Sequence, residues 1–176
     1  MTTLDKDKVV GLLNQILEQE LAGVVRYTHY SFLVFGFGRI PIVSWLRAQA
    51  DESLLHAQQA GEMITLMGAH PSLAIGPLLD SHQHDIATIL RESLEAEGAA
   101  LDLYRELHHA VEGKSVALEE YARQMIYAEE LHRGEVDKML RKPGELRAFG
   151  TGLIEDREAH PGGTGSGAAA DVSLPS

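Results

Sequence analysis

The stretch ALEEYARQMIYAEELHRGEVDKML at residues 117–140 joins the pattern of a core helix to charged groups that a core excludes. Its apolar residues recur at the spacing of one helix face, which predicts a helix. Where the buried stripe should continue, the sequence has Glu129, Glu130 and His132. Glu129 and His132 are three residues apart, so they project as neighbours from one side of the helix. The segment therefore predicts a helix that offers one oxygen ligand and one nitrogen ligand to a metal.

An earlier segment repeats this pairing of acid and histidine. DESLLHA at residues 51–57 corresponds to AEELHRG at residues 128–134 and places Glu52 four residues before His56. Residues four apart also share a helix face. A second helix is therefore predicted to supply a carboxylate and an imidazole, with Asp51 as the alternative to Glu52.

Two further segments repeat a glutamate followed by a tyrosine. ELAGVVRY at residues 20–27 and EGAALDLY at residues 97–104 both read Glu, six residues, Tyr. Together with the acid and histidine pairs, they relate the two halves of the chain by an internal repeat. The repeat selects Glu20 and Glu97 as inward carboxylates. Glu95 competes for the third-helix position, but only Glu97 reproduces the spacing to the tyrosine.

The two repeated tyrosines are predicted to lie beside the same site. Tyr27 and Tyr104 follow their glutamates by seven residues, which is two helical turns and nearly the same stripe. A hydrogen bond to a ligand, or electron donation during oxidation, would make them catalytic. Packing at the edge of the core is the alternative interpretation.

Helical periodicity extends over most of the chain, and strand-like alternation is absent. The long connection at residues 69–80, with Pro71, Gly76 and Pro77, separates the second and third helices, whereas the other connections are short. We expect an all-α, ferritin-like four-helix bundle with a long crossover between the second and third helices. The four helices are predicted at about 5–35, 41–67, 81–112 and 116–141, within a bundle domain of residues 1–149. Residues 150–176 are predicted to form a flexible tail rich in Gly, Ala and Ser, and a short fifth helix around 144–149 stays open.

The repeated motifs together supply enough ligands for two cations. Four carboxylates and two imidazoles from four helices match the arrangement of di-iron and di-manganese carboxylate bundles. Hard carboxylates, neutral imidazoles and the absence of cysteine favour iron or manganese, and zinc could also bind without redox chemistry. Without a metal, several buried carboxylates would repel one another and take up protons. The predicted metal ligands are Glu20, Glu52, His56, Glu97, Glu129 and His132.

The composition restricts the classes of partner. Asp and Glu number 26 against 15 Lys and Arg, and the resulting formal charge of −11 attracts cations but repels nucleic acid and anionic lipid. No run approaches the roughly 20 apolar residues that span a bilayer. The chain has no cysteine, which fits a reducing compartment. We therefore expect a soluble, cytoplasmic protein that binds neither membranes nor nucleic acid.

Over about residues 5–141, the sequence resembles the ferritin superfamily, and in particular bacterioferritin and its haem-lacking relatives. The resemblance rests on EQELAGVVRY, DESLLHAQQAGEMITLMGAHP, LEAEGAALDLYREL and AEELHRGEVDKML. It implies that the six predicted ligands form a ferroxidase centre with two iron ions. It also implies oxidation of Fe(II) by oxygen or hydrogen peroxide and storage of Fe(III) inside a homo-oligomeric shell.

Two positions depart from the family pattern. The family places the second-helix acid three residues before its histidine, where this chain has Ser53. Leu54 stands in the place of the methionine that ligates haem in bacterioferritin, so we expect no haem. Other functions that the motifs allow are a Dps-type mini-ferritin that protects against peroxide, a di-metal catalase or oxygenase, and a metal-stabilised scaffold protein.

Overall fold

The computed structural model describes residues 3–78 and 82–147, and within them it contains four helices and no strand. This confirms the predicted all-α, four-helix architecture. All four helices belong to one compact unit, Met1–Lys142, and a second unit comprises Pro143–Ser176. Residues 144–147 are not helical, whereas the remainder of the expected fifth helix and the predicted tail lie outside the described residues. The helices are α1 (Lys6–Leu33), α2 (Arg39–Leu66), α3 (Ile86–Val111) and α4 (Val116–Leu140).

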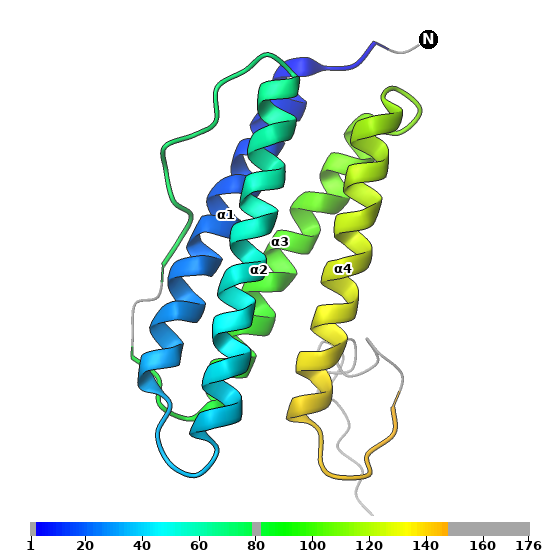
Figure 1. Cartoon of the computed structure of the whole chain (residues 1–176). Coiled ribbons are helices and arrows are strands. Elements are labelled where there is room, and N and C mark those ends of the chain that lie inside the picture. The colour runs from blue at the N-terminus through cyan, green and yellow to red at the C-terminus, as the bar shows by residue number, and fades with distance from the viewer. Residues whose placement is uncertain (1–2, 79–81, 148–176) are drawn as a thin grey trace, which may run out of the picture. The chain divides into compact units, whose positions relative to one another are not determined.

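The connections set the topology of the bundle. The short turn between α1 and α2, and the short turn between α3 and α4, each make an antiparallel pair (Figure 1). The long segment between α2 and α3 returns along the bundle, so the second pair starts at the opposite end from the first, and α2 and α3 run parallel (Figure 1). The predicted order of short, long and short connections is therefore confirmed.

Local capping explains where the helices begin. The side chain of Asp5 accepts a hydrogen bond from Lys8 N at 3.1 Å and caps α1, and Ser115 caps α4 as the sequence predicts. The third helix starts later than its predicted beginning near residue 81. Asp85 causes this difference, because its carboxylate accepts the N–H of Thr88 at 2.8 Å and so fixes the first turn after it.

The long crossover is fastened to α1 by hydrogen bonds. Ser72 N donates to the side-chain oxygen of Asn14 at 2.7 Å, and Gly76 N donates to the backbone oxygen of Glu18 at 2.8 Å. The backbones approach closely at Gly76, where an added Cβ would lie 3.0 Å from that same oxygen of Glu18. The crossover is thus held against the helix that carries the first predicted ligand.

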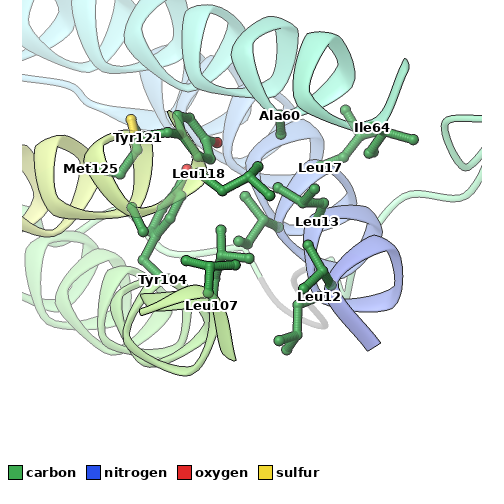
Figure 2. Packing of buried hydrophobic residues seen from close by; sticks show 14 of the residues in the cluster. Leu12, Leu13, Leu17, Ala60, Ile64, Tyr104, Leu107, Leu118, Tyr121 and Met125 are labelled. Carbon is green, nitrogen blue, oxygen red and sulfur yellow. The ribbon is translucent and has the colours of Figure 1, made fainter. Parts of the chain in front are cut away.

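Two apolar clusters fill the interior of the bundle. The larger joins the first part of α1 and the end of α2 to the end of α3 and the start of α4; Figure 2 shows Leu13, Ile64 and Leu107 converging in it. The smaller cluster contains Tyr30 and Leu46 and packs the opposite parts of α1 and α2 against the start of α3. Burial of each large side chain stabilises the bundle by about 1.5–3 kcal/mol. None of the four helices in the described part of the chain is long and apolar enough to cross a membrane.

Substitution of Gly76 tests the close contact between the crossover and α1. Gly76→Ala should lower the free energy of unfolding by about 1–3 kcal/mol, because the new methyl group meets backbone rather than a side chain that can move. Gly61→Ala in α2 is the matched control: nothing lies within 4 Å of its added Cβ, so the variant should gain up to about 1 kcal/mol from helix propensity. Urea unfolding followed by circular dichroism measures both changes. Equal effects of the two substitutions would contradict the contact.

Candidate metal centre

A buried cavity lies between the two apolar clusters. Its volume is about 30 Å³, close to that of one water molecule or one ion. Four of the predicted ligands are buried, and each comes from a different helix: Glu20, His56, Glu97 and Glu129. His132 adds a fifth group, with a side chain that is 15% exposed. The cavity lining includes all six predicted ligands, Glu20, Glu52, His56, Glu97, Glu129 and His132.

Three of these groups form a compact trio. Nδ1 of His56 lies 3.0 Å from Oε1 of Glu129 and 3.6 Å from Oε1 of Glu20. One ligand atom from each residue lies within 4.8 Å of the other two, which is a separation that one bound cation can span. The trio therefore brings two carboxylates and one imidazole from three helices to one point.

The second half of the repeat supplies a pair at the same cavity. Nδ1 of His132 lies 3.4 Å from Oε1 of Glu97. The other carboxylate oxygen of Glu97 and Nε2 of His132 are buried and make no hydrogen bond. A buried carboxylate oxygen without a hydrogen-bond donor is costly, so a bound cation would supply the partner that this oxygen needs.

The remaining candidate carboxylates lie differently. Glu52 has a side chain that is 42% exposed, and its Oε1 lies 4.0 Å from Nε2 of His56, the ring nitrogen opposite the one that faces the trio. Asp51 is exposed and lines a separate surface hollow. Glu95 is also exposed, whereas Glu97 is 7% exposed. The geometry therefore places Glu52 at the rim of the cavity and keeps Asp51 and Glu95 outside it.

The two repeated tyrosines hold the glutamates in a reciprocal arrangement. Tyr104 of α3 donates a hydrogen bond to Glu20 of α1 at 2.8 Å, and Tyr27 of α1 donates one to Glu97 of α3. Both tyrosines are buried, at 0% and 2% exposure. Each hydroxyl thus orients a carboxylate from the other half of the repeat, which is more than packing at the edge of the core. Trp45 packs beside Tyr27 at 6.2 Å between ring centroids.

Sequence reasoning did not single out two buried polar residues that line the cavity, Arg26 and Gln49, and it treated Ser53 only as a departure from the family. For Ser53 the repeat contained the signal, because Ser53 precedes His56 as Glu129 precedes His132. Arg26 gave no such signal, since most arginines on a helix reach solvent.

The electrostatics of the metal-free centre follow from burial of like charges. Burial, together with the negative charge of Glu129, raises the pKa of both Glu20 and Glu97. Burial alone would lower the pKa of His56, but hydrogen bonds with Glu129 and Glu20 outweigh it and raise that pKa to about 10. Burial lowers the pKa of His132. In the absence of a metal, the cluster therefore retains protons that a bound cation would displace.

The donor set fits a divalent cation. Oxygen and imidazole ligands without thiolate suit iron, manganese or zinc, and the orphaned oxygen of Glu97 needs a positive partner. A second group of metal-ligand residues in the described part of the chain, His108, His109 and Glu112, is largely exposed. Nε2 of His108 already accepts a hydrogen bond from Arg123 at 3.2 Å, so the buried cavity is the better candidate.

Comparison with protein families gives a match over most of the bundle. The model of the ferritin family, described as a ferritin-like domain, matches residues 10–144. No functionally curated protein matches the sequence. The family match confirms the resemblance of the sequence motifs to the ferritin superfamily.

Solved structures share the fold at low sequence identity. A ferritin-like, diiron-carboxylate protein from Bacillus anthracis aligns with a TM-score of 0.72 and 21% identity over 80% of this chain and 100% of its own. A dodecameric thioferritin from Bacteroides fragilis aligns with a TM-score of 0.71 and 21% identity over 78% and 87% of the two chains. Rhodobacter capsulatus bacterioferritin aligns with a TM-score of 0.68 and 23% identity over 79% of this chain and 86% of its own. These similarities establish the ferritin-like arrangement of the four helices.

The raised pKa of His56 predicts how pH affects the metal-free protein. The native state keeps a proton that the unfolded chain releases above pH 6.5, so stability should fall as pH rises from 7 toward 9. The slope from one such proton is up to about 1.4 kcal/mol per pH unit. His56→Gln should flatten it, whereas His70→Gln, at an exposed position of the crossover, should keep the wild-type slope. Urea unfolding at pH 7, 8 and 9 in the presence of a chelator measures this. Parallel slopes in the wild type and in His56→Gln would exclude the effect.

Proposed function

Because this chain belongs to the ferritin-like domain family, we propose that it is a di-iron ferroxidase, which oxidises Fe(II) with oxygen or hydrogen peroxide and stores Fe(III) in a homo-oligomeric shell in the cytoplasm. One observation carries the proposal. Three glutamates and two histidines from all four helices meet at a single cavity that lies between two apolar clusters. Such a costly arrangement is expected only where cations are bound.

Fe(II) would be the substrate, and the buried carboxylates and imidazoles would hold it. Glu20, His56 and Glu129 would receive one ion, and Glu97 with His132 would receive the other, with Glu129 close to both. Carboxylates stabilise Fe(III) more than Fe(II) because they are hard anionic ligands, and this favours oxidation. Glu52 adds negative charge at the exposed rim of the cavity, where an arriving cation would first meet it.

The electron balance of the proposed reaction needs two substrate ions. Two Fe(II) ions each lose one electron, and hydrogen peroxide takes up the pair together with two protons to give two molecules of water. With oxygen as the oxidant, the same two electrons and two protons give hydrogen peroxide. The protons of the metal-free cluster leave when the cations bind, so the two protons that the oxidant takes up come from solvent, which reaches the cavity at its exposed rim beside Glu52.

The tyrosines would fix the ligands before the substrate arrives. The hydroxyl groups of Tyr104 and Tyr27 donate to Oε1 of Glu20 and of Glu97, respectively, and Oε2 of Glu97 is left without a hydrogen bond. Their buried rings also lie within electron-transfer distance of the ligands. We propose orientation as the main role and electron donation as the second.

Exposed apolar side chains support self-association. Phe35, Phe37 and Ile40 around the turn between α1 and α2 are 66%, 111% and 83% exposed. Three large apolar side chains exposed around one turn would favour a contact with another protein molecule. The negative charge of the chain would in turn attract iron cations to the assembled shell.

Replacement of a buried ligand tests the proposed ferroxidase centre. Glu129→Ala or Glu97→Ala should slow rapid Fe(II) oxidation by at least about 100-fold, because ligands matter at least as much as the groups that orient them. Glu130→Ala is the matched control, since Glu130 forms a surface ion pair with Arg105 and its loss should leave the rate unchanged. Stopped-flow absorbance after anaerobic Fe(II) loading gives the rates, and circular dichroism checks the helices.

The product of that reaction separates the proposed function from its alternatives. Iron retained in a large assembly after oxidation supports storage. Rapid turnover of peroxide without retained iron would instead identify a di-metal catalase or oxygenase. Metal binding without oxidation of Fe(II) in the wild type would instead support a metal-stabilised scaffold protein. Unchanged oxidation rates in both Glu129→Ala and Glu97→Ala would show that this site takes no part in Fe(II) oxidation.

Loss of one hydroxyl tests the role assigned to the tyrosines. Tyr104→Phe should slow Fe(II) oxidation about 10–100-fold, because Glu20 loses the donor that orients it. Tyr127→Phe, at a position of α4 that is 67% exposed, should oxidise Fe(II) at the wild-type rate. A further measurement on Tyr104→Phe, the affinity for redox-inert Zn²⁺, distinguishes the two roles. Weaker zinc binding supports orientation, whereas slower oxidation with unchanged zinc binding would point to electron donation alone.

A further inference from the structure

The two halves of the metal centre are not equivalent. The repeat pairs Glu20 with Glu97 and His56 with His132. The residue three before His132 is Glu129, and the residue three before His56 is Ser53. The trio of Glu20, His56 and Glu129 therefore has as its counterpart Glu97, His132 and a hydroxyl group. This inference rests on the proposed function, because it concerns how the same centre binds its cations.

The structure places Ser53 in the lining of the metal centre. Ser53 is 9% exposed and lines the cavity with the six predicted ligands. It packs directly against α1, where a Cβ added at Gly23 would lie 2.7 Å from its Oγ. A neutral hydroxyl at this point binds a divalent cation far less strongly than a carboxylate does.

Glu52 does not replace the missing carboxylate in the observed arrangement. Its side chain is 42% exposed at the cavity rim, and its closest contact among the ligands is with Nε2 of His56, at 4.0 Å. Nδ1 of the same ring is the atom that faces Glu129 and Glu20. Glu52 thus lies on the side of His56 away from the trio.

Positively charged side chains also make the two halves of the centre different. Arg26 is 7% exposed and lines the cavity, and its counterpart in the repeat is Leu103. Arg133 lies beside the backbone next to Glu97: a Cβ added at Gly98 would be 3.7 Å from its guanidinium. Arg26 and Glu97 line the same cavity. A second cation near Glu97 would be repelled by both guanidinium groups.

We propose that the centre binds its cations in a fixed order, the first tightly between Glu20, His56 and Glu129, and the second at least tenfold more weakly at Glu97 and His132. The substitution of a carboxylate by Ser53 and the positive charge of Arg133 beside the backbone next to Glu97 are its physical causes.

Anaerobic titration with Mn²⁺, followed by electron paramagnetic resonance, tests this order without any oxidation. The six-line signal of free Mn²⁺ gives the bound fraction directly, and magnetic coupling reveals two ions at one centre. The wild type should bind one Mn²⁺ per chain tightly, with an isolated-ion spectrum, and a second at least tenfold more weakly. Two equally tight ions would overturn the inference and leave the proposed function standing. No bound Mn²⁺ and no bound Fe²⁺ would overturn both.

Two substitutions at one position isolate the role of the missing carboxylate. Ser53→Glu should tighten the second ion at least tenfold and produce a coupled spectrum, whereas Ser53→Gln, of the same size but neutral, should tighten it by less than threefold. Equal tightening by both variants, or by neither, would refute the role of Ser53.

A second pair of variants keeps the test decisive if substitutions at Ser53 do not fold. Glu20→Gln should remove the tight ion, and Glu97→Gln should remove only the weak one. The reverse assignment would overturn the order.

Discussion

The burial of three carboxylates in one helical bundle is the constraint on which the rest of the structure depends. Glu20, Glu97 and Glu129 are each less than a tenth exposed. An ion in such surroundings loses several kcal/mol of hydration, and three like charges add their mutual repulsion. The apolar packing must therefore stabilise the bundle independently of the centre. The two clusters on either side of the cavity do so, and they leave a polar layer between them.

The internal repeat allows two simple helical hairpins to build one centre. Each hairpin carries a glutamate, a tyrosine and a histidine, but neither hairpin completes the site. The hydroxyl of each tyrosine reaches the glutamate of the opposite hairpin, and His56 of one hairpin meets Glu129 of the other. Docking of the hairpins and formation of the site are consequently one event. The site can therefore form only when both hairpins are correctly packed.

The sequence predicted the helices and which of the acids and histidines lie on the inward faces, because both depend on local periodicity. Glu97 could be separated from Glu95 by spacing alone, and the structure has the first buried and the second exposed. The beginning of α3 was predicted too early, because the cap at Asp85 is a local contact that periodicity does not register. Arg26 was missed because only tertiary packing removes a helical arginine from solvent. The place of Glu52 at the rim likewise depends on how α2 rotates against its neighbours, which sequence spacing leaves open.

The attachment of the crossover to α1 also bears on the geometry of the centre. Its contact through Gly76 meets the backbone of Glu18, only two residues before Glu20. The crossover therefore contacts α1 next to Glu20, the first predicted ligand. This contact restrains movement of the α1 backbone there. A change in the length or sequence of this crossover would therefore be felt at Glu20, whereas the turns at the ends of the bundle lie far from it along the chain.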